Sequence, residues 1–413
     1  FTAAVNPDFG SIESDNVVVN LTANETFFPE KRLFFLEGSD IFNLSQNDYG
    51  YGKQALSVVN TRRIGGRPRD IDLPDGVELS ERQELLPADI ITAAKATGQI
   101  GSFRYGVLTA FESTTNYIAD NNQAYSQDGR DFGVFRLLYE DSIGAAYRGL
   151  GWITTLVQHP EAEAIVHGTD FHYLTTNGKW NVNGQALFSD RSETGTGAGG
   201  TVDLTYTKHQ GLKHIIRTSI LDDEINVNDL GFQTRNDISN FEYRVEWIKS
   251  GLKRIRNFRF APFIRYGENG AGLPVNHSYV MSGLVTFHNL FRISGFLGLA
   301  GSRFEDRNSF GNGTYALGDR VMGDLRFASD ESKPLSIAGK IGVRGEDVYG
   351  NSIESHIGLN WRPKHNLSIG IKVFHSDRNG WLLHQEDRNF TAFQGKQWQP
   401  ELNLEFFPNS KQQ

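Results

Sequence analysis

The chain has 413 residues, no cysteine and a formal net charge of −8 at pH 7. The lack of cysteine excludes disulfide scaffolds, thiolate metal sites and cysteine nucleophiles, and the acidic balance disfavours a nucleic-acid-binding protein, which would carry a basic patch. Only 38% of the residues are hydrophobic, whereas 12% are aromatic and 44 are glycines, a composition that favours many short strands joined by glycine-bearing turns over a helical fold.

Residues 1–95 are rich in Asn, Asp, Pro and Arg and show little sustained alternation of polar and apolar residues. Within them the stretch NETFFPEKRLFFLEG, residues 24–38, carries four phenylalanines around a Pro-Glu-Lys-Arg core. This is too much aromatic surface for a loop in water and too much charge for an ordinary core. The lumen of a barrel suits both, because the rings can pack against the segment's own backbone while the charges meet charged side chains on the wall. We therefore predict that residues 1–95 form a plug-like segment.

Charged residues of both signs are concentrated in this predicted plug. A polar lumen wall offers charges of both signs and little apolar surface, so ion pairs would hold a segment that is threaded through it. We predict a structural ion-pair network formed by Glu25, Glu30, Lys31, Arg32, Glu37, Arg62, Arg63 and Arg67. A constriction that binds anions through the arginines is the functional alternative.

The remaining residues, 96–413, alternate between polar and apolar. The stretch FEYRVEW sets Phe241, Tyr243, Val245 and Trp247 against Glu242, Arg244 and Glu246. Residues 180–189, 202–206, 293–299, 353–360 and 367–373 show similar alternation. A period of two is that of a β-strand, because successive side chains leave opposite faces. Polar breaks of alternating length separate these segments, as in an up-and-down barrel with one loop-bearing rim, and their spacing indicates about fourteen to sixteen strands.

The predicted fold class is therefore all-β, a transmembrane up-and-down antiparallel β-barrel formed by residues 96–413. No run approaches the ~20 apolar residues of a membrane helix, but a β-barrel crosses a bilayer with half of its side chains polar. A β-propeller and a pair of β-sandwiches remain alternatives. A propeller would repeat a signature of ~40 residues, and none is visible. Sandwich cores must interdigitate closely, whereas the apolar faces here mix large aromatic residues with many glycines.

Some strings imitate motifs that carry chemistry. GTGAGG, residues 195–200, has the glycine spacing of a dinucleotide-binding loop, but a strand-like segment follows it. Phosphate binding would require a helix N-terminus there. Neighbouring carboxylates such as Asp222 and Asp223 are typical of hydrated loops. A catalytic pair of a glycosidase cannot be recognised from such neighbours, because it is defined by the separation of its carboxylates in space. We predict no catalytic, metal-binding or cofactor-binding residue, and no cofactor.

The N-terminal part contains, in order, NPDFGSIESDNVVVNLT, ETFFPEKRLFFLEGSDIF, TRRIGG and ITAAKATGQIG, and the chain closes on SDRNGWLLHQEDRNFTAF and WQPELNLEFFPNSKQQ. These segments resemble the signatures of a poorly characterised bacterial family of large outer-membrane β-barrel proteins. In that family a carbohydrate-binding family 9-like domain usually precedes the barrel. The resemblance covers most of the chain. It implies that this domain, a signal peptide and a final strand lie outside the present sequence, and it carries over no catalytic residue.

Together these observations predict a protein of the bacterial outer membrane, embedded in outer-membrane lipid, that serves the passage, capture or anchoring of a ligand. The resemblance implies a glycan-related ligand. Asn, Gln, Arg and Glu side chains of the lumen would set selectivity, and the predicted plug would limit the bore. Two alternatives remain. One is a carbohydrate-active hydrolase with carboxylates at the rim, although the sequence favours a protein that is not an enzyme. The other is a structural sheath or platform for an outer-membrane or periplasmic protein partner.

Overall fold

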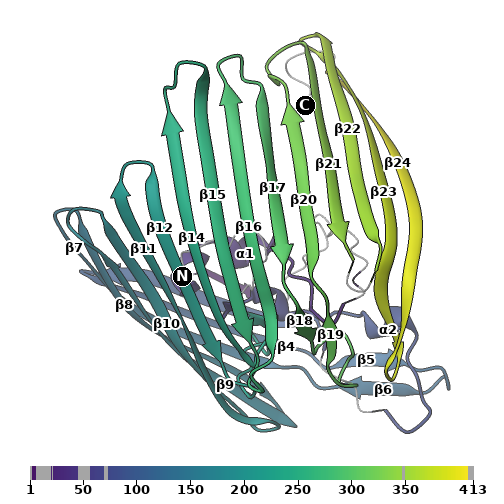
Figure 1. Ribbon diagram of the computed structural model, residues 1–413. Helices are drawn as coiled ribbons and strands as arrows, with labels where there is room; N and C mark the ends of the chain where they lie inside the picture. Colours follow the sequence, from purple (N-terminus) through teal and green to yellow (C-terminus); the bar gives the residue numbers. More distant parts are fainter. Residues whose placement is uncertain are drawn as a thin grey trace. The chain divides into compact units, whose positions relative to one another are not determined.

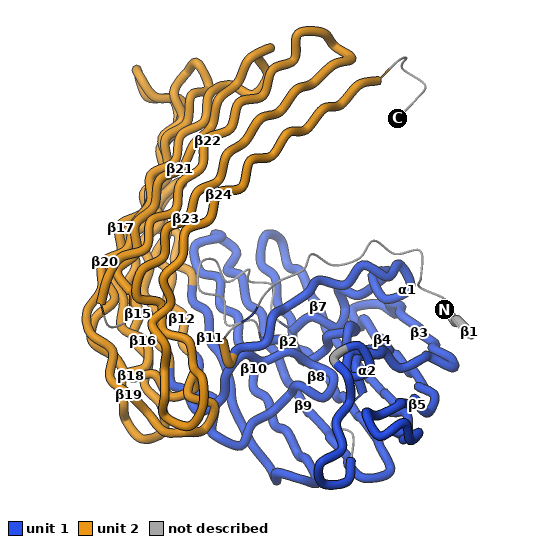
Figure 2. The backbone as a smooth tube through the Cα atoms, turned by 90° about the vertical axis from the view of Figure 1, so that its right-hand side faces the viewer, with its two compact units in different colours: residues 1–20, 24–204, 219–239 blue, residues 21–23, 205–218, 240–413 orange. Residues whose placement is uncertain are grey.

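The computed structural model describes residues 2–5, 20, 22–44, 56–68, 73–346 and 349–407. Strands make up 65% of the structure and helices 4%, so the prediction of an all-β fold is confirmed (Figure 1). The chain divides into two compact units (Figure 2). Unit 1 comprises residues 1–20, 24–204 and 219–239, and unit 2 comprises residues 21–23, 205–218 and 240–413. In the described ranges no helix is long and apolar enough to cross a membrane.

The main element is one large antiparallel sheet. Among the described residues it contains 18 strands. In chain order they are β1 (Thr2–Val5), β3 (Ile90–Ile100), β4 (Phe103–Glu112), β7 (Asp131–Ile143), β8 (Ala146–His159), β9 (Ala162–Leu174), β10 (Trp180–Arg191), β11 (Gly195–His209), β12 (Leu212–Leu221), β14 (Ile238–Ser250), β15 (Ile255–Glu268), β16 (Pro274–Phe287), β17 (Arg292–Ala300), β20 (Arg320–Ala328), β21 (Leu335–Gly345), β22 (Asn351–Lys364), β23 (Leu367–Glu386) and β24 (Asn389–Phe406).

Smaller elements lie before the sheet and in its loops. Three two-stranded ribbons pair β2 (Leu56–Ser57) with β13 (Phe232–Gln233), β5 (Thr115–Ile118) with β6 (Ala124–Gln127), and β18 (Arg303–Glu305) with β19 (Tyr315–Leu317). The helices are short: α1 (Leu33–Leu36), the 3₁₀ turns η1 (Ser39–Phe42) and η2 (Thr61–Arg63), and α2 (Glu81–Glu84).

Strands that follow one another in the chain are neighbours in the sheet. In unit 1 the antiparallel pairing runs β1–β3–β4–β7–β8–β9–β10. In unit 2 it runs from β15 through β16, β17, β20, β21, β22 and β23 to β24. Strands β11, β12 and β14 follow β10 in the order of the sheet. This confirms the predicted up-and-down antiparallel arrangement.

Two details differ from the sequence-based expectation. The strand number is higher than expected, in part because β1 lies inside the segment predicted as a plug. The sheet of the described residues is not closed into a ring, so closure into a barrel stays a prediction. Strand β3 begins at Ile90, and the division of the chain into residues 1–95 and 96–413 likewise stays a prediction.

Unit 1 has a core between one face of its strands and two irregular segments. The first is the N-terminal segment, which we define as residues 24–44 and 56–68, and the second is the loop of residues 222–237. Ile64 and Ile225, one from each segment, are fully buried. A β-carbon added at Gly106 of β4 would meet Ile41 and Phe42 of the N-terminal segment at about 3 Å. The two segments therefore cover the strands directly.

Candidate functional site: the polar face of the sheet

Each unit presents one face of its strands that carries most of the charged side chains, and we call it the polar face. In unit 1 its charged residues include Lys95, Glu112, Arg136, Asp170 and His172, all buried. In unit 2 they include Arg217, Glu242, Arg244, Arg265, Asp324, Arg326, Lys340, Glu354, Lys372 and Glu401, whose partners are given below. The opposite face is the apolar face.

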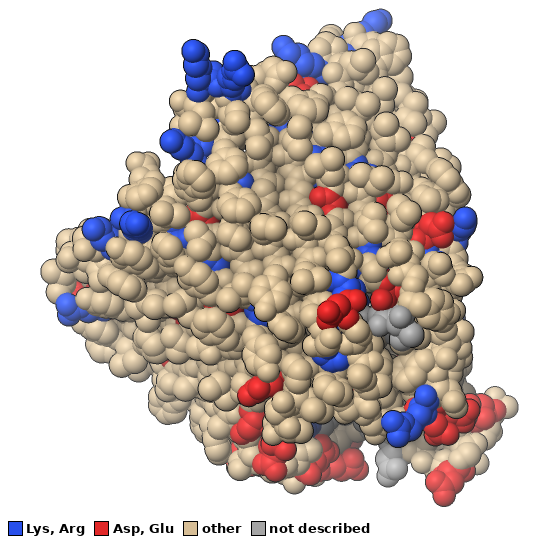
Figure 3. Space-filling model, in the orientation of Figure 1, with Lys and Arg blue, Asp and Glu red and all other residues tan. Residues whose placement is uncertain are grey.

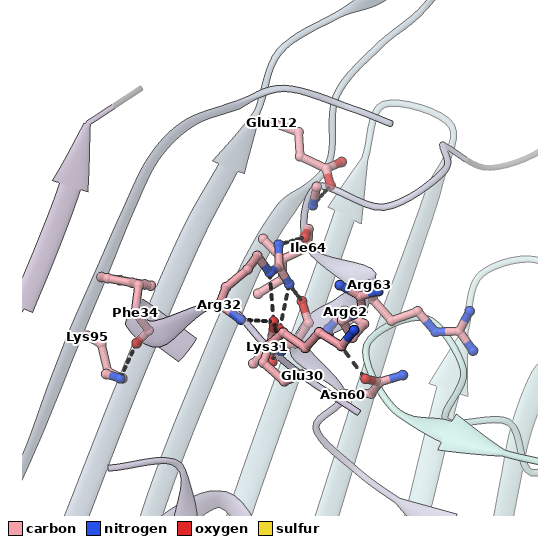
Figure 4. A network of polar contacts seen from close by, with 12 residues as sticks. Glu30, Lys31, Arg32, Phe34, Asn60, Arg62, Arg63, Ile64, Lys95 and Glu112 are labelled. Atoms are coloured by element: carbon pink, nitrogen blue, oxygen red, sulfur yellow. Dashed lines mark hydrogen bonds and ion pairs between the residues drawn. The ribbon is translucent and has the colours of Figure 1, made fainter. Parts of the chain in front are cut away.

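The polar face of unit 1 holds the N-terminal segment through the backbone of that segment. Arg136 Nε donates to the carbonyl oxygen of Ile41 at 3.0 Å. Lys95 Nζ donates to the carbonyl oxygen of Phe34 at 2.5 Å (Figure 4). It also donates to the carbonyl oxygen of Glu37. Charged donors in a site with little water make strong hydrogen bonds. The polar face of unit 1 therefore fixes the path of the N-terminal segment around α1 and η1.

A second attachment lies near η2. Glu112 Oε1 accepts from the backbone nitrogen of Gly65 at 2.7 Å, and the Glu112 carboxylate pairs with Arg130, whose Nε lies 2.9 Å from Oε2. Arg130 Nη2 donates in turn to the carbonyl oxygen of Arg63 at 3.0 Å. The buried ion pair of Glu112 and Arg130 thus makes further hydrogen bonds to the backbone of the N-terminal segment. Such additional hydrogen bonds offset the cost of removing the two charges from water.

Arg136 is the centre of a buried polar cluster. Its Nη1 and Nη2 donate to the two oxygens of Asp170 at 2.5 and 2.8 Å, a bidentate pair. His172 Nε2 lies 2.8 Å from Asp170 Oδ2, and its Nδ1 lies 2.8 Å from Asn183 Oδ1. A β-carbon at Gly151 would come within 2.4 Å of both Arg136 Nη1 and Asp170 Oδ1. Only glycine leaves room for this pair between β7 and β9.

Within the stretch of residues 24–38, Glu30 and Arg32 form a compact, part-buried pair. Arg32 Nη2 lies 2.7 Å from Glu30 Oε2, and the same guanidinium donates to the carbonyl oxygens of Ile64 and Thr61 at 2.7 and 2.5 Å. It also stacks on the Phe35 ring at 4.3 Å. Burial alone would raise the pKa of Glu30, but the hydrogen bonds and charge of Arg32 outweigh it and hold the pKa below its ordinary value.

The other predicted network residues are placed as follows. Glu25 pairs with Arg63 at 2.6 Å. The Glu37 carboxylate accepts from Thr2 Oγ1 at 3.5 Å. The Lys31 backbone nitrogen donates to Glu30, that of Arg62 donates to Asn60 Oδ1, and the carbonyl oxygen of Arg67 accepts from Arg130. The structure thus brings together Glu30 with Arg32 and Glu25 with Arg63, while one network that joins all eight residues stays a prediction.

On the polar face of unit 2 the charged side chains form pairs across and along the strands. Glu242 of β14 is buried and lies within 3.3 Å of three guanidinium groups, those of Arg217, Arg244 and Arg265. Arg244 and Arg265 also lie over the Phe263 ring, at 4.5 and 5.5 Å. Further along the sheet, salt bridges join Asp324 to Arg326, Glu354 to Lys340 and Glu401 to Lys372.

One family model matches almost the whole chain. The family model described as "Domain of unknown function (DUF5916)" matches residues 1–412. The chain is a member of the DUF5916 family. None of the curated proteins matches it.

Some solved structures resemble this DUF5916 chain at low identity. OccAB4 of Acinetobacter baumannii is 8% identical, the match covering 76% of this chain and 95% of that one, with a TM-score of 0.36. OccK10 (OpdN) of Pseudomonas aeruginosa is 11% identical over 71% and 88% of the two chains, with a TM-score of 0.38. A bacterial polysaccharide outer membrane secretin is 6% identical over 75% and 99%, with a TM-score of 0.34. Likeness at this level carries no argument about function.

A shallow groove opens on the polar face of the DUF5916 chain between β21 and β24. Its volume is about 560 Å³. Small residues such as Ala338, Gly358 and Gly370 form part of its lining, and hydrogen-bonding side chains surround them: Ser336, Asn360, Ser368, Lys372, Glu401 and Asn403. Such a lining suits a polar ligand. Within the described ranges no group of three or more His, Cys, Asp or Glu residues could hold a metal ion.

Sequence reasoning missed Arg136, Asp170 and His172. The signal available was a single charge in phase with apolar residues: Arg136 shares its face of β7 with Phe132, Val134 and Leu138. A single charged residue among apolar neighbours on one side of a strand indicates a buried partner. The identity of that partner cannot be read from one strand alone.

Proposed function

We propose that this chain is a β-barrel of the bacterial outer membrane that serves the passage or capture of a ligand, with the N-terminal segment as a plug that narrows the bore. The observation that carries the proposal is an inverted distribution of side chains. The charged side chains face one way and are mostly paired, whereas large apolar side chains on the other face are exposed.

The exposed apolar face is extensive in both units. In unit 2 it includes Phe241, Trp247, Leu325, Ile341 and Ile357, with Leu325 and Ile341 each 55% exposed and Ile357 53%. In unit 1 it includes Phe135, Leu137, Trp152 and Phe171. Soluble monomers rarely expose contiguous apolar patches larger than a few hundred Å². In a bilayer such a face is stable, because the acyl chains cover it and the pairing of strands satisfies the hydrogen-bonding groups of the backbone.

The role of the N-terminal segment as a plug is supported by its contacts in unit 1. Arg136, Lys95 and Glu112 are strand residues that bind its backbone rather than its side chains. A segment held in this way lies against the polar face, where a solute would pass. Deleting residues 24–68 should raise single-channel conductance in planar bilayers. Unchanged conductance would contradict the plug and leave the membrane barrel standing.

We further propose a glycan-related ligand and, as partners, outer-membrane lipid and an outer-membrane or periplasmic protein. The glycan class is supported by the resemblance to proteins that carry a carbohydrate-binding family 9-like domain. The groove between β21 and β24 is compatible with it, because Asn360, Asn403 and Glu401 offer hydrogen-bonding groups for hydroxyls. Saturable heats of binding in calorimetric titrations of the wild type with soluble oligosaccharides, lost in Asn403→Leu, would support it. Identical titrations of both proteins would refute it.

The membrane assignment itself is tested by cell fractionation. The protein should sediment with the outer membrane, resist extraction by alkaline carbonate and migrate differently on gels before and after boiling. Recovery in the soluble periplasmic fraction would refute the proposal.

A further inference from the structure

The two ends of the strands in unit 2 differ in charge. Since successive strands are antiparallel, the turns β11–β12, β14–β15, β16–β17, β20–β21 and β22–β23 lie at one end. We call this the basic end. Its exposed basic residues are Lys208, Lys213, Lys249, Lys253, Arg254, Arg256, Arg292, Lys333, Arg362 and Lys364. The acidic residues at this end are Asp330 and Glu331 in these five turns and Glu405 near the end of β24.

The opposite end carries acidic loops. The acidic residues in or beside the connections β15–β16, β17–β20, β21–β22 and β23–β24 are Glu268, Glu305, Asp306, Asp319, Glu346, Glu386 and Asp387, and five arginines lie among them: Arg303, Arg307, Arg320, Arg344 and Arg388. In Figure 3, Lys and Arg atoms gather at the upper margin, where β14 to β17 end in Figure 1. The separation is notable because the whole chain has a net charge of −8.

The β14–β15 turn is the most strongly charged part of the basic end. Four exposed cations occur between residues 249 and 256, and no Asp or Glu occurs between residues 247 and 263. Arg292, at the start of β17, has one salt bridge, to Glu331 at 2.6 Å. A concentration of exposed cations with so few carboxylates is more than solubility requires, and it attracts anions.

Aromatic residues adjoin the basic end. Trp247 packs edge-to-face on Phe258 with ring centroids 5.4 Å apart, and Phe287 and Phe291 lie 6.2 Å apart. Trp361, one residue before Arg362, is 47% exposed. Aromatic girdles mark the level of the lipid headgroups on membrane barrels. Lys and Arg side chains just beyond such a girdle can extend into the headgroup layer.

We propose that the basic end binds the phosphate groups of anionic membrane lipids at one interface of the bilayer. This inference rests on the proposed membrane location. Guanidinium groups bind phosphate oxygens in a bidentate manner, and lysines add charge. The acidic end is repelled by the same lipids, so the charge separation also orients the protein, with its basic end toward the more anionic leaflet.

The test uses the folded protein in bilayers of phosphatidylcholine mixed with phosphatidylglycerol. Acyl chains brominated near the headgroup quench tryptophan, and Trp247 and Trp361 lie beside the basic end. Brominated phosphatidylglycerol should quench these tryptophans several-fold more effectively than brominated phosphatidylcholine. The preference should fade at ~1 M salt, where the Debye length falls to about 3 Å.

Two double variants make the test specific. Lys253→Gln with Arg254→Gln removes two cations from the β14–β15 turn and should reduce the preference. Arg82→Gln with Arg388→Gln removes the same charge elsewhere, both residues being exposed, and should leave the preference unchanged.

The outcomes separate the two proposals. Failure to fold into bilayers of phosphatidylcholine alone would contradict the membrane location. If the protein folds in these bilayers but shows no preference for phosphatidylglycerol, the lipid site alone would be overturned. An equal loss of that preference in both double variants would have the same meaning. Loss of the preference with inorganic phosphate, at constant ionic strength, would show a site for free phosphate and would also overturn it.

Discussion

A charge placed on the apolar face distinguishes a lipid environment from water. Ile357 lies at the middle of β22 and is 53% exposed. If water covered it, Ile357→Arg would change the free energy of unfolding by no more than about 0.5 kcal/mol, as is usual at protein surfaces. If acyl chains cover it, an arginine at the bilayer midplane costs about 2–4 kcal/mol. That cost lowers the ratio of folded to unfolded protein about 30- to 700-fold.

Asn360→Arg is the matched control. Asn360 is exposed on the same strand but belongs to the polar face. Its replacement loses one hydrogen bond, from Ser368 Oγ at 3.0 Å, worth about 1 kcal/mol. The assay is equilibrium urea unfolding in phosphatidylcholine vesicles, followed by tryptophan fluorescence and by gel migration without boiling. Equal, small losses in the two variants would refute the assignment of the apolar face to lipid.

Three further predictions concern the contacts of the N-terminal segment. Arg136→Met leaves the buried Asp170 with His172 as its remaining partner and should cost about 3–5 kcal/mol of unfolding free energy in the same urea titration; a loss below about 1 kcal/mol would contradict the cluster. Gly151→Ala crowds that pair and should cost about 1–3 kcal/mol, whereas an unaltered midpoint would show that the pair can move aside. Glu30→Gln should destabilise the protein at neutral pH by about 1.5–3 kcal/mol, the worth of hydrogen bonds to the charged Arg32. Folding lowers the pKa of Glu30, so the stability that its carboxylate contributes is present above its ordinary pKa and is lost as the pH falls through the folded-state pKa. The unfolding free energies of the wild type and Glu30→Gln should therefore converge in acid. A difference between them that does not depend on pH would contradict this account.

The alternation of polar and apolar residues predicted the strands and their two faces well. In FEYRVEW, Phe241 and Trp247 are exposed while Glu242 is buried among arginines. In a soluble protein, a strand with this pattern would bury its aromatic residues and expose its charged ones. The mixture of large aromatic residues and glycines on one face indicated that this face is not a protein core, because a close-packed core does not accommodate such a mixture.

The attachment of the N-terminal segment could be foreseen only in part. Charge density predicted that eight charged residues of this segment form ion pairs, but it did not say which, and the structure pairs Glu30 with Arg32 and Glu25 with Arg63. The contacts to the wall escaped prediction, since Arg136 and Lys95 bind carbonyl oxygens of Ile41 and Phe34. Every residue has a carbonyl oxygen, so such an acceptor leaves no mark in the sequence.

The central claim is that the apolar face lies in a membrane. The most direct measurement is to fold the urea-unfolded chain in the presence of phosphatidylcholine vesicles and to compare its gel migration with and without boiling. We predict that the unboiled protein migrates as a compact band, that it floats with the vesicles in a density gradient, and that vesicles protect its strands from added protease. A chain that refolds equally well without lipid and remains at the bottom of the gradient would contradict the account.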